Sequence, residues 1–497
     1  MSLKEDVQRR ETETKLLDML RIVDNTALSG RHKLWLYNNA VVCRLSWDLM
    51  VYDFPASYVE SLHMQANAFV KKWAGLSLHG PNPTILYLPR SEKGLAIVHL
   101  VHFFQNMTIV REHLLKYSRD PYVAKLAEWR LERENENRQA KWRPAVALHA
   151  AERGLALEPR GQTSRAGLGY GVSNHAPLPA PGTREHRQVV TEFNKQRQVE
   201  KMTTQLHELT VQADWRKWAG VMAQDLSWNR VLYRMSDQEL KFYLQGTLQI
   251  APTPAYLKRL GYITGEACCS LCGKRGGALY HILSCCHTAL DQGRYLWRHN
   301  EVLKILHYVV GRFVRTMTPD KVRREQATKQ FVRAGQKVQK VHKPPALLET
   351  ACDWHIVVDL PGMRSQFPQH IAVTEKKPDL VIWSDSTRVL IMVELTVPSE
   401  RNVYAAHERK DYRYGKPGGL KDACTDYTVY LLPVEVGVLG FVADSTRRAL
   451  QRLGVWSGPL ATELEGMALS CSYAIFVARK QQSWLNWRMF DPTRLKC

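Results

Sequence analysis

Long apolar runs are missing from this sequence of 497 residues. No stretch approaches the roughly 18–20 apolar residues that a membrane-spanning helix requires. The opening segment MSLKEDVQRRETETK is charged and lacks the apolar core of a signal peptide. We therefore expect no membrane partner and a reducing compartment, in which the ten cysteines do not form disulfides.

Acidic residues are scarce in comparison with basic ones. Asp and Glu total 48 against 69 Lys and Arg, which gives a net charge of +21. Such an excess usually reflects an anionic polymer or an anionic membrane surface as partner. Because no membrane segment is expected, the sequence predicts nucleic acid as the partner.

The chain is too long for a single hydrophobic core, so several domains are expected. Apolar residues recur at helical spacing early in the chain, Pro and Gly gather in a linker, and short β-like runs fill the last part. The predicted segments are a helical domain (1–125), charged helices and a linker (126–210), a helical connector (211–267), a cysteine-rich segment (268–300), an amphipathic helix with a basic segment (301–345), and an α/β domain (346–497).

Two apolar runs in the last segment predict a β-hairpin with an acid on each strand. In KPDLVIW an apolar run directly follows Asp379, SDST is typical of a turn, and VLIMVEL contains Glu394. A turn centred on residues 386–387 gives cross-strand partners whose numbers sum to about 773, which places the two acids opposite each other. Two carboxylates so close repel unless a cation lies between them, and Mg²⁺ prefers such oxygen ligands.

A helix is predicted to follow this hairpin, with Ser399 as its N-cap and Tyr414 near its end. Lys410 then shares one face with His407 and Tyr414, from which it can reach the two acids. A lysine there can position the attacking water and offset charge in the transition state. Lys410 therefore joins the two acids as a candidate catalytic residue.

A simpler interpretation of the hairpin stays open. Acids at strand ends are commonly just solvated, and His407 and Tyr414 are residue types that usually pack. Glu394 is harder to explain in this way, because an acid seldom interrupts a buried strand.

Five of the ten cysteines fall between residues 268 and 286. In a reducing compartment such a cluster favours a metal site over disulfides. The predicted structural zinc ligands, spaced Cys-x2-Cys-x8-His-x4-Cys, are Cys269, Cys272, His281 and Cys286. Cys268 and Cys285 are adjacent alternatives for the first and last ligand. The other interpretation is a set of buried free cysteines around a core histidine.

Basic side chains beyond the cysteines suit contact with phosphate. Arg294, Arg298 and His299 are three of these, although a solvated helix face would carry the same residue types. The basic segment that follows is expected to grip a phosphate backbone through Lys321, Arg323, Arg324, Lys329, Arg333, Lys337 and Lys340. That grip should weaken steeply with salt.

The two acids with their spacing resemble the PD-(D/E)xK nuclease superfamily, but Thr396 stands where that motif usually has lysine. The strings ACDWHIVVDL, KPDLVIW, VELTVPSE and HERKDYRY resemble the endonuclease of site-specific non-LTR retrotransposons. In that family the lysine lies on the following helix, which maps onto Lys410. Asp353 and Asp359 lie in a matching segment. CSLCGKRGGALYHILSCC resembles the CCHC zinc knuckle that precedes the nuclease in the same proteins.

The N-terminal strings GRHKLWLYNNAV, KKWAGLS and LYLPRSEKGLAIVHL resemble the reverse-transcriptase thumb of these elements. The resemblance implies that Lys71, Lys72 and Arg90 contact a nucleic-acid backbone. A polymerase palm needs metal-binding aspartates, typically a pair, and the sequence has no Asp-Asp. We therefore expect no reverse-transcriptase activity from this chain.

Together, the residues and the resemblance predict a multidomain α + α/β protein. It would comprise a helical thumb-like domain, a zinc knuckle and a restriction-like α/β nuclease domain. The expected activity is Mg²⁺-dependent nicking of double-stranded DNA in the nucleus, with structural zinc and with element RNA as a second partner. The alternative is a catalytically inactive nucleic-acid-binding relic of a retrotransposon.

Overall fold

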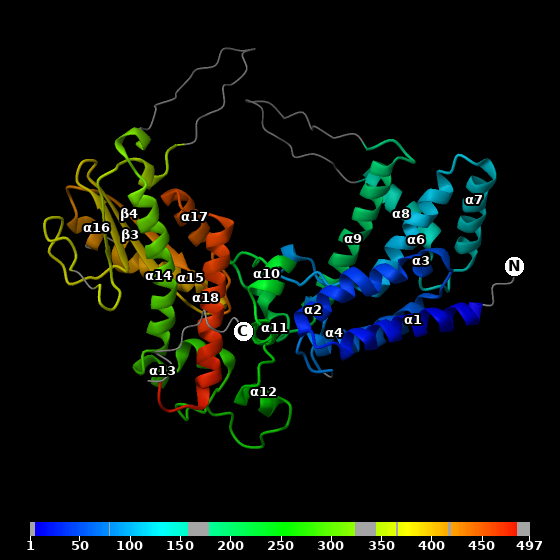
Figure 1. Cartoon of the computed structure of the whole chain (residues 1–497), viewed down its shortest axis with the longest axis horizontal. Coiled ribbons are helices and arrows are strands. Elements are labelled where there is room, and N and C mark those ends of the chain that lie inside the picture. Colours follow the sequence, from blue (N-terminus) through cyan, green and yellow to red (C-terminus); the bar gives the residue numbers. More distant parts are fainter. Residues whose placement is uncertain are drawn as a thin grey trace, which may run out of the picture. The chain divides into compact units, whose positions relative to one another are not determined.

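The computed structural model describes residues 5–78, 80–157, 178–323, 344–363, 366–415 and 419–484. The chain divides into two compact units (Figure 1). Unit 1 consists of Met1–Thr210 with Leu226–Leu232, and unit 2 consists of Val211–Asp225 with Tyr233–Cys497. The coarse prediction of a helix-rich chain with a small α/β part is confirmed.

The described residues of unit 1 form helices joined by loops, with no strand among them. Its main helices are α1 (Glu5–Asn25), α2 (Gly30–Leu36), α3 (Val42–Val51), α4 (Ala56–Trp73), α5 (Thr84–Tyr87), α6 (Leu100–Lys116), α7 (Pro121–Glu136), α8 (Pro144–Leu157) and α9 (Arg184–His207). Helix α6 lies at the centre, because it packs against α3, α4, α7, α8 and α9. Its buried Phe104 and Ile109 face these neighbours.

Unit 2 holds the only sheet among the described residues. Its helices are α11 (Asp237–Thr247), α12 (Pro254–Arg259), α13 (His287–Asp291), α14 (Arg294–Arg315), α15 (Val403–Gly415), α16 (Leu420–Ala423), α17 (Asp444–Leu453) and α18 (Gly458–Val477). The short helix α10 (Trp228–Tyr233) belongs to unit 1 except for its last residue. The strands are β1 (Trp354–Val358), β2 (Leu380–Ser384), β3 (Val389–Thr396) and β4 (Thr428–Glu435).

The four strands lie in the order β1-β2-β3-β4. The β2–β3 hairpin is antiparallel, and Leu380 pairs with Val393 while Ser384 pairs with Val389. This is the register expected from the sequence. Strand β1 is antiparallel to β2, whereas β4 is parallel to β3. The parallel partner follows from α15, which carries the chain back to the starting end of the sheet before β4 begins.

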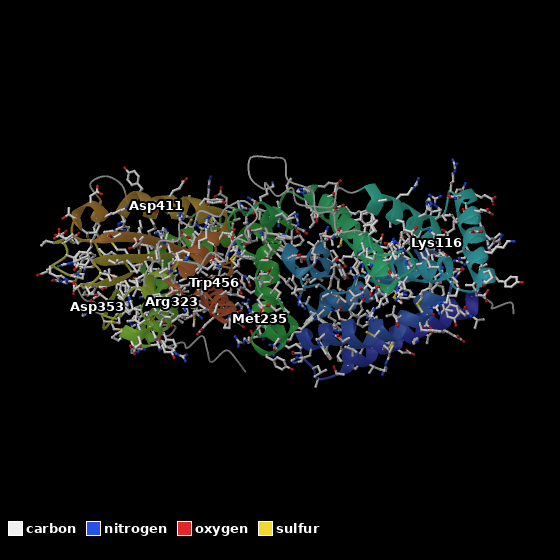
Figure 2. The ribbon with its side chains drawn as sticks, turned by 90° about the horizontal axis from the view of Figure 1, so that it is seen from above. Lys116, Met235, Arg323, Asp353, Asp411 and Trp456 are labelled. Atoms are coloured by element: carbon white, nitrogen blue, oxygen red, sulfur yellow. The ribbon has the colours of Figure 1, made fainter. Side chains whose placement is uncertain are left out.

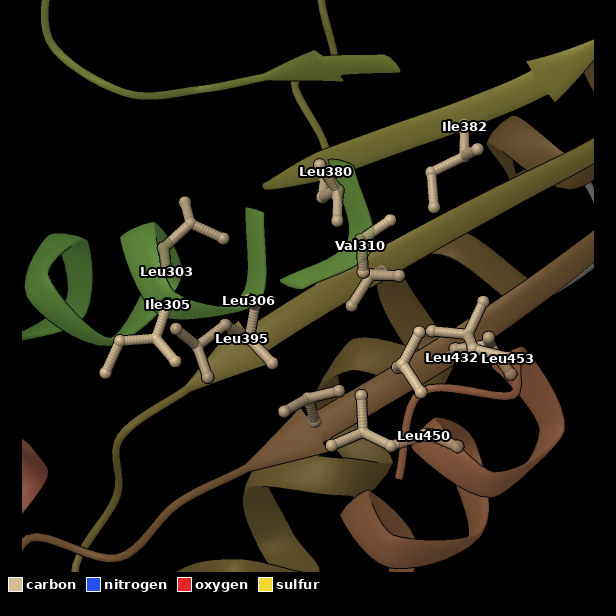
Figure 3. Close-up of a cluster of buried hydrophobic side chains, with 14 of the residues drawn as sticks. Leu303, Ile305, Leu306, Val310, Leu380, Ile382, Leu395, Leu432, Leu450 and Leu453 are labelled. Carbon is tan, nitrogen blue, oxygen red and sulfur yellow. The ribbon is translucent and has the colours of Figure 1, made fainter. Parts of the chain in front are cut away.

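Each face of the sheet is covered, which explains why β3 is apolar along almost its whole length. On one face, Leu380 and Leu395 pack in a cluster with residues of α14, α17 and α18, as Figure 3 shows for α14 and α17. On the other face, Met392 packs with Tyr414 of α15 and Leu420 of α16. Helix α15 therefore lies over the face that carries the acids.

Helix α14 runs without a break from Arg294 to Arg315. The sequence analysis divided this stretch at residue 300, between the cysteine-rich segment and the amphipathic helix. Its buried residues include Val302, Leu306 and Val310, which pack on the sheet. A single rigid element thus joins the region after the cysteines to the α/β core.

By length and composition alone, the stretch Gly458–Lys480, which contains α18, could cross a membrane, and it is the one such helix among the described residues. Most of it is buried inside unit 2, where α18 packs against α14 and α11. Core helices of this kind satisfy the same test of length and hydropathy.

Candidate active site and metal centre

The predicted catalytic residues converge from three elements. Asp379 directly precedes β2, Glu394 lies in β3, and Lys410 lies on α15. The Lys410 ammonium donates to Oε2 of Glu394 and lies 3.9 Å from Oδ2 of Asp379. Glu394 is 1% exposed, so its charge is almost completely removed from water. A buried acid with a nearby lysine is the kind of group expected at a functional site.

Two further hydrogen-bond donors lie close to Oδ2 of Asp379. The backbone N–H of Leu395 donates to it over 2.8 Å, and Nε2 of His299 lies 3.3 Å away. The other ring nitrogen of His299 contacts Oδ1 of Asn300 at 3.2 Å. His299 was expected to contact phosphate, but the structure places it against Asp379. We call Asp379, Glu394, Lys410 and His299 the carboxylate cluster.

The cluster perturbs the pKa of each acid in a different direction. Burial, together with the charge of Asp379, raises the pKa of Glu394. Burial also acts to raise the pKa of Asp379, but the hydrogen bond and charge of His299, with Lys410, outweigh it and lower that pKa. For His299, burial opposes protonation, yet Asp379 raises its pKa overall. The site thus holds one readily ionised acid beside one whose charged form is disfavoured.

Only one of the carboxylate oxygens of Glu394 has a hydrogen-bond partner among the described residues. The nearby Tyr414 hydroxyl interacts with the carboxylate and acts to lower its pKa, but Oε1 is buried and accepts no hydrogen bond of normal geometry within the part of the chain that the structure describes. A buried carboxylate oxygen without a partner is costly, and such an atom usually indicates a missing ligand or water.

A second buried acid lies on the same face of the sheet. Thr396, at the usual lysine position of the motif, pairs with Glu435 of β4. The Glu435 carboxylate is fully buried and is met by Nδ1 of His407 at 2.9 Å and by the hydroxyl of Ser445. On helix α15, Lys410 therefore contacts Glu394, and His407, one turn earlier, contacts Glu435. Glu435 was not among the predicted site residues, because the contacts of Glu435 depend on the parallel β3–β4 pairing.

The predicted zinc ligands form a compact cluster. The ligand atoms of Cys269, Cys272, His281 and Cys286 all lie within 4.8 Å of one another. Sγ of Cys272 is 3.3 Å from Nε2 of His281, and the Sγ atoms of Cys269 and Cys286 are 4.0 Å apart. This set could bind a metal such as zinc. Cys285, one of the two alternatives left open by the sequence, is exposed and lies outside the set.

A tight turn brings the first two cysteines together. The N–H of Gly273 donates to the carbonyl of Cys269, and the N–H of Cys269 donates to the carbonyl of Lys274. Gly273 has a φ of +71°, a conformation that side chains with a Cβ rarely adopt. His281 begins a short π-helical turn that ends at Cys285, just before the last ligand. We call residues 268–286 the cysteine loop.

Arg294 was expected to contact phosphate, but this prediction is wrong. The residue is 0% exposed and cannot reach a phosphate at the surface. Its guanidinium donates to the carbonyls of Ala478 and Gln481 over 2.9 and 2.6 Å. Burial lowers its pKa, while nearby Cys286 and Cys269 raise it. A buried cation beside two cysteines would offset thiolate charge, which suits a metal-bound state of the loop.

Arg298 is a second correction, since it is 2% exposed. Its guanidinium donates to the carbonyls of Leu283 and Val397 and to the Ser472 hydroxyl. Burial lowers its pKa to about 10. We expected both arginines on an exposed helix face, because amphipathic patterning assigns charged residues to solvent. Instead they are buried, and backbone carbonyls accept hydrogen bonds from their guanidinium groups.

The basic residues of unit 1 differ in exposure. Lys71 is a third correction, because it is buried, donates to the carbonyl of Leu78 over 3.2 Å, and has a pKa lowered by burial. Lys72 is exposed and forms a 2.8 Å ion pair with Asp24. Arg90 is partly exposed. Lys72 and Arg90 therefore remain available for the predicted contacts.

The predicted basic segment is described only at its start. Lys321 is exposed and donates to the carbonyl of Thr316. Arg323, labelled in Figure 2, is exposed and lies 3.6 Å from Glu349. The remaining predicted contacts lie outside the described residues, namely Arg324, Lys329, Arg333, Lys337 and Lys340.

The two aspartates that flank β1, Asp353 and Asp359, have different surroundings. Asp353, also labelled in Figure 2, accepts from the hydroxyls of Ser384 and Ser386 and so fixes the β2–β3 turn. The N–H of Asp359 donates to the carbonyl of Asp379 over 3.0 Å, which extends the β1–β2 pairing to the carboxylate cluster. Asp353 has a structural role, while Asp359 lies beside the site.

Comparisons with known proteins do not identify a family. No protein-family model matches the chain, and a search of curated proteins returns no significant match.

Proposed function

We propose that unit 2 is a metal-dependent endonuclease that nicks double-stranded DNA, as the resemblance to retrotransposon nucleases implies. One observation carries the proposal, namely the convergence of Asp379, Glu394 and Lys410 from two strands and a helix. Two acids and a lysine at the end of a hairpin are the groups that metal-assisted phosphodiester hydrolysis requires.

The residues fit a divalent cation such as Mg²⁺. Both acids supply hard oxygen ligands, and Oε1 of Glu394 is buried without a partner in the described part of the chain. When bound, the cation would polarise the scissile phosphate and lower the pKa of a water molecule. It would also relieve the repulsion that raises the pKa of Glu394 beside Asp379.

The side chains of the cluster have separable roles. Lys410 is 21% exposed, so its ammonium can turn from Glu394 toward a phosphate or the attacking water. His299 and the Leu395 N–H hold Asp379 Oδ2 in place. The net charge of +21 favours binding of DNA.

The second candidate function is binding of nucleic acid without cleavage. The observation in its favour is that Lys410 contacts Glu394 directly, which occupies one oxygen of the acid. In this arrangement Lys410 balances the charge of Glu394 without a metal ion. The two functions differ in whether a metal ion displaces Lys410 from Glu394.

Supercoiled plasmid incubated at low salt with the purified full chain separates these functions. Wild type is expected to give nicked circles with Mg²⁺ and none with EDTA. Asp379→Asn and Lys410→Met should each lower the rate at least about 100-fold. The matched controls are Asp426→Asn and Lys421→Met, which change exposed residues.

Two results would count against the proposal. Nicking by Asp379→Asn at the wild-type rate would exclude this site as the catalytic one. Plasmid binding without nicking by wild type, over varied targets and with Mg²⁺ present, would favour the second function.

A further inference from the structure

The N-terminal turns of α14 are attached to the cysteine loop. The hydroxyl of Tyr295 accepts from the N–H of Cys286 at 3.1 Å and donates to the carbonyl of Ile282 at 2.8 Å. It also lies 3.3 Å from the carbonyl of His281. One hydroxyl thus bonds to the backbone of two cysteine-loop residues that are themselves candidate metal ligands.

Arg298 attaches the same helix to both the loop and the sheet. Its Nη2 atom donates to the carbonyl of Leu283 at 2.9 Å and to that of Val397 at 3.3 Å. Val397 directly follows β3, three residues after Glu394. Because Arg298 is buried, a shift of either carbonyl would leave a desolvated charge without its partner, which is strongly unfavourable.

The next residue on α14 is His299, whose ring meets Asp379. Consecutive residues of one rigid helix therefore contact the cysteine loop and the catalytic acid. A helix transmits a displacement of its first turns because its backbone bonds keep the spacing between neighbouring residues fixed. Any movement of Tyr295 or Arg298 would move the His299 ring at Asp379.

The ligand end of the cysteine loop has only a small core of its own. It consists of Cys269, Leu271, Cys286 and Ala289, with Cys272 and Tyr295 packed against them, while the turn His281–Cys285 also packs against α18. A metal that joins the ligands of such a loop stabilises its conformation. Because the carbonyls that hold Tyr295 and Arg298 lie in this turn, between the ligands His281 and Cys286, their positions depend on how these ligands are held.

We propose that Tyr295, Arg298 and His299 are positioning residues that make the geometry of Asp379 depend on an intact, metal-loaded cysteine loop. The inference rests on the proposed nuclease function. It assigns the loop a role in catalysis that differs from gripping DNA. A loop that only grips DNA would affect the KM for DNA, whereas a loop that positions the acid affects cation binding and kcat.

The test uses the full chain loaded with zinc and compares matched variants of α14. Tyr295→Phe removes only the bridging hydroxyl, and Tyr308→Phe removes a hydroxyl from an exposed tyrosine of the same helix. Arg298→Lys and Arg312→Lys form a second pair, one buried and one exposed. Zinc content, Mg²⁺ affinity by calorimetry, kcat and KM are measured for each.

Tyr295→Phe and Arg298→Lys should keep about one zinc per chain but bind Mg²⁺ roughly tenfold more weakly. Their kcat should fall by a similar factor, while the KM for plasmid stays within about twofold of wild type. Both exposed controls should behave as wild type. If Arg298→Lys does not fold, Tyr295→Phe decides the question alone.

His299 provides a rescue experiment. His299→Gln keeps a nitrogen donor near Asp379 and should retain more Mg²⁺ affinity than His299→Ala. Equal affinities for the two would overturn its positioning role. Wild-type Mg²⁺ affinity and kcat in Tyr295→Phe, or a raised KM alone, would overturn the coupling while leaving the nuclease intact. Absence of Mg²⁺ binding by wild type would instead overturn the proposed function, and this inference with it.

Discussion

Lys410 and Glu394 form a buried charge pair that uses only one oxygen of the carboxylate. The ammonium contacts Oε2, whereas Oε1 is buried and has no partner in the described part of the chain. An ion pair that served folding alone would be expected to satisfy both oxygens. The half-satisfied carboxylate lowers stability and leaves an oxygen available to a ligand, which supports a functional role for the pair.

Removing the lysine should therefore destabilise the fold. Lys410→Met leaves Glu394 with neither a cation nor water, and we expect a loss of about 1–3 kcal/mol in the free energy of unfolding. Adding Glu394→Gln to Lys410→Met should recover most of that loss, because the buried charge is then gone. Urea unfolding in EDTA measures both effects as a double-mutant cycle. Lys421→Met, at an exposed site, is the control, and equal stability of Lys410→Met and wild type would contradict the prediction.

The contact between His299 and Asp379 predicts a dependence of stability on pH. The raised pKa of His299 means that the folded state holds this proton more tightly than the unfolded state, whose pKa is about 6.5. The contribution is therefore fully present below about pH 6.5 and is lost as the pH rises through the higher pKa of the folded protein.

His299→Gln isolates this contribution, because glutamine does not titrate. The stability advantage of wild type over His299→Gln should shrink as the pH rises from about 5 to about 9, in urea unfolding of the zinc-loaded proteins without Mg²⁺. His307→Gln changes another histidine of α14, whose pKa is lowered by burial, and should not show that loss. A pH-independent difference between wild type and His299→Gln would show that the ion pair does not form.

The parts of the site that the sequence predicted correctly are local. The β2–β3 register follows from a turn between two short strands. The helix after β3 is present as predicted, but α15 starts at Val403, after a short 3-10 turn, and Ser399 makes no capping hydrogen bond. Alternation and turn residues define such a hairpin without knowledge of the rest of the fold. The spacing of the cysteines likewise identified the ligand set that the structure brings together.

The parts that the sequence did not predict depend on distant segments. His299 precedes Asp379 by many residues, and only the packing of α14 on the sheet brings them together. The burial of Arg294 and Arg298 depends on carbonyls that follow α18 and on one of the cysteine loop. Glu435 meets its partners through a parallel pairing that no hairpin rule specifies.

Substitution of one cysteine should reveal the metal of the loop. We expect about one zinc per chain in wild type and at least about tenfold weaker zinc binding in Cys272→Ser, because Cys272 lies within the ligand set. Cys285→Ser is the matched control, since this exposed neighbour lies outside the set. Elemental analysis after dialysis against a weak chelator measures the difference. Similar zinc loss in Cys285→Ser, or no zinc in wild type, would contradict the ligand assignment.

The neighbouring lysines of α4 should differ in their effect on DNA binding. Lys71 is buried and bonded to the carbonyl of Leu78, so Lys71→Met should cost about 1 kcal/mol of stability and leave DNA affinity unchanged. The ammonium of Lys72 is exposed and can exchange Asp24 for a phosphate. Lys72→Met should therefore weaken binding of a labelled duplex and reduce by about one the slope of log affinity against log salt. Fluorescence anisotropy over a range of KCl concentrations measures that slope, and an unchanged slope in Lys72→Met would exclude α4 from the interface, since its other basic residue in this turn faces inward.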